Sequence, residues 1–106
     1  MNFKMVLLYL LAVGKTLEWT IASGRTFQIS GDHRLAAYWE RFFPPKSGMP
    51  HPTRRHLLAE EAEEAFLAGT EFTLYESNFD QGEKLTRQEL FAKINGLFPG
   101  FAKGGE

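Results

Sequence analysis

Residues 76–91, ESNFDQGEKLTRQELF, carry enough side-chain oxygens to suggest a calcium loop that leads into a helix. A helix–loop–helix calcium site needs an acid at loop position twelve, glycine at position six, and a helix on each side. If Asn78 is position one, Glu89 is position twelve, but position six is then Glu83, which resists the left-handed backbone that glycine adopts freely. The preceding residues 70–76 favour a strand over an entering helix. We therefore predict that this segment does not bind calcium.

Ordinary helix-start chemistry accounts for the same residues. With Thr86 as the N-cap, Glu89 stands at N3, so the two form a capping box. Leu85 and Leu90 then occupy the positions of a hydrophobic staple, and the DQGE stretch before them is a turn. The pattern predicts an amphipathic helix over residues 87–98.

The histidines offer a second set of candidate ligands. His51, His56 and Glu60, with His33 as an alternative, could form the site of a small metal-dependent enzyme. The paired histidines at i and i+4 of a catalytic zinc helix are absent. Ser47 lies near His51 but in no nucleophile elbow, and the chain has no cysteine. We therefore predict no catalytic residues, no metal site and no cofactor, and rank the metal-dependent enzyme last.

Charge is distributed unevenly, although the net charge is only −1. Residues 33–56 are basic and residues 57–89 are acidic. We define the basic patch by five residues: Arg34, Arg41, Lys46, Arg54 and Arg55. We define the acidic patch by four residues: Glu60, Glu61, Glu63 and Glu64. Both patches are candidate contact surfaces.

These patches suggest two functions. The first is a small non-enzymatic binding protein, an inhibitor, adaptor or immunity-type protein, that docks on a larger protein partner through charged surfaces. The alternative is a nucleic-acid-associated module that uses the basic segment 33–56. The acidic neighbour would repel nucleic acid unless it faces away. The motifs resemble no known family, and the sequence leaves the partner and the oligomeric state open.

Length and composition limit the class of protein that these functions can belong to. The chain has 106 residues, of which 43% are hydrophobic and 24% charged, as in ordinary globular proteins. We expect one domain over residues 1–98 and a C-terminal tail over 99–106. Absence of cysteine fits a cytoplasmic protein, and no stretch is long enough to span a membrane.

Four strands are predicted. The apolar run 5–13 reads as a strand buried on both faces, in preference to a short signal peptide over residues 1–14. Residues 16–22 and 26–30 alternate and continue a three-strand meander. Residues 70–76 alternate again and are expected to pair beside the first strand, opposite the second.

Three helices complete the prediction. One follows Asp32 and keeps Leu35, Trp39, Phe42 and Phe43 on one apolar face before Pro44 ends it. The second begins at a Thr53 cap and ends at Leu67 or Ala68, and the third covers residues 87–98. The expected fold is therefore α+β, a small antiparallel sheet with about three helices packed on one face, in the order βββ-αα-β-α.

Overall fold

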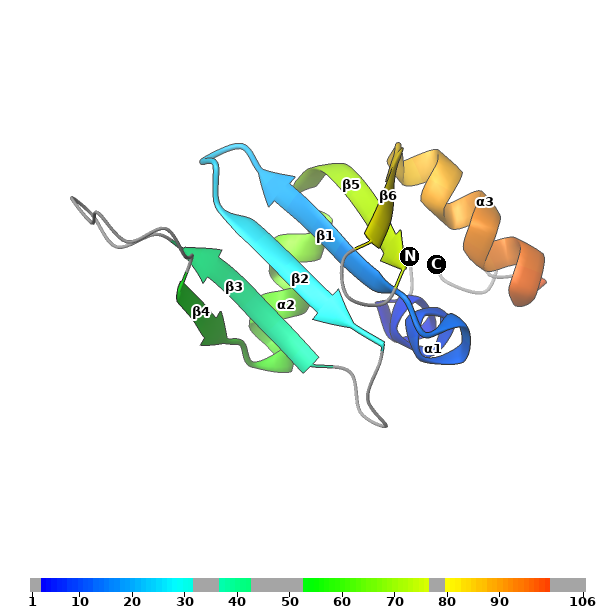
Figure 1. The fold of residues 1–106 in the computed structure, drawn as a ribbon, viewed down its shortest axis with the longest axis horizontal. Helices are drawn as coiled ribbons and strands as arrows, with labels where there is room; N and C mark the ends of the chain where they lie inside the picture. The colour runs from blue at the N-terminus through cyan, green and yellow to red at the C-terminus, as the bar shows by residue number, and fades with distance from the viewer. Residues whose placement is uncertain (1–2, 32–36, 43–52, 77–79, 100–106) are drawn as a thin grey trace.

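The computed structural model describes residues 3–31, 37–42, 53–76 and 80–99 (Figure 1). Its elements are α1 (Phe3–Val13), β1 (Thr16–Ile21), β2 (Thr26–Ser30), β3 (Ala37–Phe42), β4 (Thr53–His56), α2 (Ala59–Leu67), β5 (Gly69–Glu76), β6 (Asp80–Leu85) and α3 (Arg87–Leu97). Within these described ranges, six strands form one sheet in the order β4-β3-β2-β1-β5-β6, and all neighbours are antiparallel. The predicted α+β class is confirmed, with six strands in place of four.

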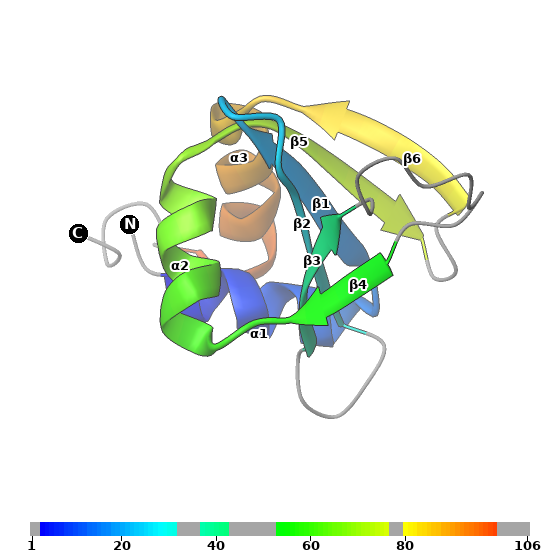
Figure 2. The ribbon, with the colours of Figure 1, turned by 90° about the vertical axis from the view of Figure 1, so that its left-hand side faces the viewer.

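The three helices α1, α2 and α3 lie on one side of the sheet (Figure 2). We call this side the helix-covered face. No helix of the described residues lies on the other side, which we call the helix-free face. Because side chains alternate along a strand, each strand contributes to both faces. In β1, Leu17 and Trp19 point into the core, whereas Glu18 and Thr20 belong to the helix-free face.

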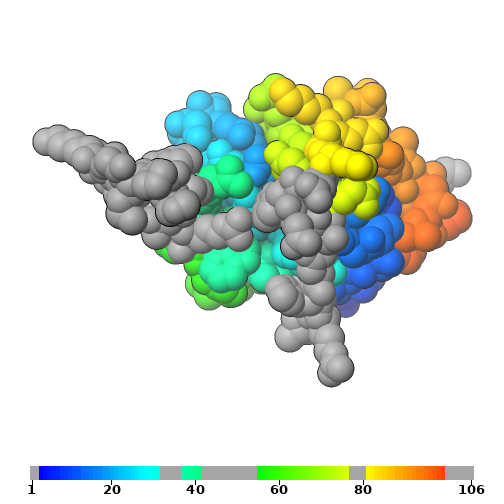
Figure 3. Space-filling view, in the orientation of Figure 1, coloured from blue at the N-terminus to red at the C-terminus, as the bar shows by residue number. Residues whose placement is uncertain are grey.

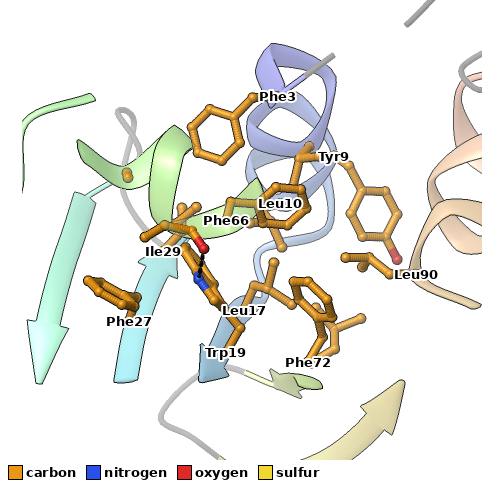
Figure 4. Close-up of a cluster of buried hydrophobic side chains, with 14 of the residues drawn as sticks. Phe3, Tyr9, Leu10, Leu17, Trp19, Phe27, Ile29, Phe66, Phe72 and Leu90 are labelled. Atoms are coloured by element: carbon orange, nitrogen blue, oxygen red, sulfur yellow. Dashed lines mark hydrogen bonds between the residues drawn. The ribbon is translucent and has the colours of Figure 1, made fainter. Parts of the chain in front are cut away.

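The buried core is built around aromatic rings on the helix-covered face (Figure 4). The Trp19 ring lies edge-on to Phe66, with ring centroids 5.5 Å apart, and stacks on Phe27 at 5.8 Å. Phe66 in turn contacts Phe72 at 5.2 Å. The indole Nε1 of Trp19 donates a 2.9 Å hydrogen bond to the Ala65 carbonyl, so the only polar atom of this side chain is satisfied.

The predicted first strand over 5–13 is wrong, because these residues form helix α1. Leu-rich sequence has higher helix propensity than β-branched sequence, and Val6 and Leu10 both face the core with no exposed surface. Gly14 ends the helix with φ at +68° and donates its amide to the Leu10 carbonyl at 2.9 Å. Strand β5 consequently pairs with β1, and not with residues 5–13.

The predicted helix after Asp32 is also wrong over residues 37–42, the part of it that the structure describes. Residues 37–42 form strand β3, which pairs with β2 on one side and β4 on the other. Aromatic side chains favour strands, and the strand pairing leaves Trp39 half-buried on the helix-free face instead of in the core. Asp32, Leu35 and Phe43 lie outside the described residues.

The second predicted helix begins later than expected. Residues 53–56 form the short strand β4, and α2 starts after Leu58, whose amide donates to the Glu61 carboxylate at 3.1 Å. Its predicted end at Leu67 is confirmed. The DQGE stretch, read as a turn, belongs to strand β6. The edge strands β4 (TRRH) and β6 (DQGEKL) consist almost entirely of polar residues, so they carry no hydrophobic alternation that the sequence could reveal.

Helix α3 forms where it was predicted. Thr86 Oγ1 accepts a hydrogen bond from the Glu89 amide at 3.1 Å, and the Glu89 carboxylate accepts one from the Thr86 amide at 2.8 Å. Arg87 Nη2 donates to the carbonyls of Phe66 and Gly69, at 2.9 and 2.8 Å. Arg87 thereby satisfies carbonyl groups at the end of α2 and fixes the start of α3 against it.

Candidate functional site

The acidic patch separates into two parts on helix α2. Glu60, Glu63 and Glu64 are exposed and, within the described part of the chain, take part in no ion pair. Glu61 lies toward the sheet, with its carboxylate 3.3 Å from Arg55 Nη2. The hydrogen bond from the Leu58 amide, and then Arg55, hold the pKa of Glu61 below its usual value. Glu61 is therefore already engaged within the fold.

The outward stripe of α2 combines charge with an exposed apolar side chain. Glu60, Glu63, Glu64 and Leu67 follow the spacing i, i+3, i+4 and i+7, so they share one helix surface. The Leu67 side chain is 56% exposed. Leu58, the N-cap of the same helix, is 64% exposed, so exposed leucines stand at both ends of α2.

The basic patch does not form one surface. Arg41 points to the helix-free face, where Nη2 lies 3.0 Å from the Glu18 carboxylate. Arg55 lies on the helix-covered face beside Glu40. Arg54 stands opposite Arg41 in the β3–β4 pairing, and its side chain is outside the description. Arg34 and Lys46 also lie outside the described residues.

Glu40 is the centre of a charge cluster that the sequence did not suggest. Its side chain is 7% exposed, and its carboxylate accepts hydrogen bonds from Arg25 Nε at 2.6 Å and Arg55 Nη2 at 2.6 Å. The Arg25 hydrogen bond, with that of Arg55, lowers the pKa of Glu40 to about 2. The same bonds raise the pKa of both guanidinium groups. This cluster joins β3, β4 and the residue that precedes β2, and it stabilises the fold.

A second charged cluster lies on the helix-free face. The Glu18 carboxylate accepts from Gln28 Nε2 at 2.8 Å as well as from Arg41. Burial raises the pKa of the Tyr75 phenol, and the negative charge of Glu18 adds to this effect. Only the β1–β2–β3 register brings Glu18, Gln28 and Arg41 together, so no local pattern could have revealed the cluster.

An open hollow of about 590 Å³ adjoins this second cluster, over β1, β5 and β6. Glu18, Thr73 and Lys84 stand side by side on its floor, because Thr73 pairs with Glu18 on one side and with Lys84 on the other. Glu71 lies two residues before Thr73 on the same face. Figure 3 views the molecule from this side, with β5 and β6 in yellow-green and yellow. Polar and apolar residues both line the hollow, and the core residues Trp19 and Phe72 are among them.

The candidate metal ligands are not assembled in the residues described. Within residues 3–31, 37–42, 53–76 and 80–99, no three His, Cys, Asp or Glu side chains are placed to hold a metal ion. His56 is exposed and lies edge-on to Trp39, with ring centroids 5.1 Å apart. His33, Ser47 and His51 fall outside the description, as does Asn78 of the calcium-loop frame.

Over the described residues the fold is α+β, with a six-stranded antiparallel sheet, three helices on one face and an open hollow on the other. Comparison of the chain with protein-family models, curated proteins and solved structures finds no match. Among the described helices, none has the length and apolar character needed to cross a bilayer.

Proposed function

We propose that this protein is a non-enzymatic binding protein, of the inhibitor or adaptor kind, that docks on a larger protein through the outward stripe of α2. The observation that carries the proposal is the stripe itself: Glu60, Glu63 and Glu64 are exposed and unpaired among the described residues, beside the exposed Leu67. Absence of cysteine supports action in the cytoplasm.

Like charges spaced by three and four residues destabilise a helix by a few tenths of a kcal/mol per pair. Elsewhere in the described chain, Glu76 and Glu83 each lie near a lysine, at 3.2 and 3.3 Å. The carboxylates of Glu60, Glu63 and Glu64 have no such compensation among the described residues, which supports a role outside the fold. A partner that supplies arginine or lysine side chains, with an apolar recess for Leu67, is complementary to the stripe.

The test compares capture of partners from a lysate by the wild-type protein and by matched variants. Glu60→Gln with Glu64→Gln removes two charges from the stripe, whereas Glu76→Gln with Glu83→Gln removes two charges elsewhere. The captured protein is then purified and titrated against all variants. The α2 pair is expected to weaken binding about fivefold, since each exposed ion pair contributes about 0.5 kcal/mol. The control pair is expected to leave binding unchanged.

Leu67→Gln tests the apolar part of the same surface. It is expected to weaken binding by about tenfold, because the polar side chain no longer fits the apolar recess of the partner. Because Leu67 is exposed, the substitution is expected to leave folding intact. Equal binding by wild-type protein, the α2 pair and Leu67→Gln would refute the proposal. Equal weakening by the control pair would show that only net charge matters and would also refute it.

A nucleic-acid-associated module is the second candidate. Helix α2 lies on the helix-covered side of the sheet, whereas Arg41 belongs to the helix-free face (Figure 2). The acidic residues of α2 are therefore on the opposite side of the sheet from Arg41. The engagement of Arg41 by Glu18 and of Arg55 by Glu40 leaves these two arginines less free for phosphates. Retention on immobilised DNA or RNA that falls steeply with salt, and is lost on Arg54→Ala with Arg55→Ala, would favour this candidate. No retention at low salt would eliminate it.

A further inference from the structure

The hollow on the helix-free face is lined by a carboxylate, a hydroxyl group and an ammonium group, those of Glu71, Thr73 and Lys84. Thr73 of β5 is half-buried, and Lys84 of β6 stands directly opposite in the strand pairing. Glu71 lies two residues before Thr73 and is therefore the diagonal cross-strand neighbour of Lys84. All three line the hollow. Diagonal neighbours are about 7–8 Å apart at the backbone, a separation that long side chains can bridge.

Glu71 and Lys84 nevertheless form no ion pair with each other or with any other described residue. Lys15 and Lys93 are also on the surface, and each lies within 3.3 Å of a carboxylate. Lys84 thus differs from these two lysines although an acid is within reach. The hollow presents an ammonium group and a carboxylate that are both available.

The neighbouring carboxylate on the floor of the hollow, Glu18, already has partners. Glu18 is held by Arg41 and Gln28 at 3.0 and 2.8 Å, so its charge is already balanced within the fold. Glu89 also lines the hollow, but its carboxylate accepts the Thr86 amide at 2.8 Å in the cap of α3. With Glu18 balanced and Glu89 engaged in this cap, the charged groups of the hollow that have no partner among the described residues are Lys84 and Glu71. A phosphate-rich ligand would be repelled by Glu71, and a polyamine would be repelled by Lys84. The complementary ligand carries one charge of each sign close together.

We propose that this hollow binds a free α-amino acid, a site separate from the α2 stripe and independent of the function proposed for it. Lys84 binds the ligand carboxylate, Glu71 binds its ammonium group, and the Thr73 hydroxyl donates a hydrogen bond to the carboxylate. The hollow of about 590 Å³ lies in the range typical of small-molecule sites and leaves room for a side chain beside Tyr75.

Nuclear magnetic resonance of the isotope-labelled full chain tests this directly. A panel of α-amino acids with apolar, polar and charged side chains is added up to millimolar concentration. At least one is expected to shift the backbone amides of residues 71–75 and 82–85 saturably, with a dissociation constant at or below about 1 mM. If no member of the panel shifts these amides, the proposal is wrong.

The amino acid with the largest effect is then compared with two analogues that keep its side chain: its amide, which lacks the carboxylate, and its des-amino acid, which lacks the ammonium group. Each is expected to bind about tenfold more weakly, because one charge-assisted hydrogen-bonded contact is lost. Equal affinity for the des-amino acid would show an anion site, and equal affinity for the amide would show a cation site; either result overturns the proposal.

Variants assign the roles within the hollow. Lys84→Met is expected to abolish the preference for the amino acid over its amide, and Glu71→Gln the preference over its des-amino acid. Glu83→Gln is the matched control, because Glu83 is on β6 but points to the helix-covered face, near Lys93. If Glu83→Gln weakens binding as much as Glu71→Gln, the ligand lies elsewhere and the assignment fails.

Discussion

The two faces of the sheet use charged side chains differently. On the helix-covered face, Glu40 is held by two arginines with N–O distances of 2.6 Å, beside a core of aromatic rings. On the helix-free face, Glu18 is held by Arg41 at 3.0 Å, but Glu71 and Lys84 beside the same cluster stay unpaired among the described residues. On the helix-covered face, Glu40 is paired within the fold. On the helix-free face, two charged side chains have no ion-pair partner among the described residues. The difference separates charges that stabilise from charges that are available to a ligand.

The largest expected effect compares the two tryptophans. Trp19 is 1% exposed and central to the core, whereas Trp39 is half-buried on the helix-free face. Trp19→Ala is expected to lower the free energy of unfolding by about 3–5 kcal/mol, because it leaves a cavity and removes the hydrogen bond to the Ala65 carbonyl. Trp39→Ala is expected to cost about 1–2 kcal/mol. Denaturant titrations measure both, and equal losses would contradict the division between the faces.

The next effect compares the two held glutamates. Glu40→Gln leaves Arg25 and Arg55 facing each other without the carboxylate, although the two guanidinium side chains are 52% and 41% exposed and water offsets part of the loss. We expect Glu40→Gln to destabilise the fold by about 2 kcal/mol, less than the loss of one partner from a fully buried pair. Glu18→Gln is expected to cost about 1 kcal/mol, since its amide oxygen still accepts from Arg41. Thermal unfolding ranks the two, and the reverse order would overturn the comparison.

Acid provides an independent test of the same cluster. The pKa of Glu40, lowered to about 2 in the fold, lies below its ordinary value of 4.5, so the unfolded chain binds more protons in this range. The stabilisation from Glu40 is therefore complete at neutral pH and is lost as the pH falls from about 5 toward 2. The stability difference between wild-type protein and Glu40→Gln is expected to shrink across that window. A constant difference from pH 7 to pH 2 would show that the carboxylate charge contributes nothing.

Sequence patterns predicted the elements whose signals are local. The capping box of Thr86 and Glu89 specifies the start of α3 within four residues, and alternation specifies β1, β2 and β5. The run 5–13 and the segment around Trp39 were assigned wrongly, because apolar spacing alone does not separate a buried helix from a strand. Their conformations depend on partners elsewhere in the chain: β3 forms between β2 and β4.

The candidate surfaces divide in the same way. Exposure of Glu60, Glu63 and Glu64 followed from helical periodicity and is observed in α2. The basic patch was an expectation from composition along the chain, and sheet register places Arg41 and Arg55 on opposite faces. Register depends on pairing between distant segments, so a charge count over consecutive residues could not have separated them.

The smallest expected effect concerns the unpaired charges of the hollow. Because Glu71 and Lys84 are exposed and make no ion pair with any described residue, Glu71→Gln and Lys84→Met are each expected to change the free energy of unfolding by less than about 0.5 kcal/mol. Denaturant titration without ligand measures this, beside Glu40→Gln as the contrasting case. A loss above about 1 kcal/mol for either variant would show that its charge supports the fold. The contrast with Glu40 would then disappear, and with it the reason to regard these two groups as free to bind a ligand.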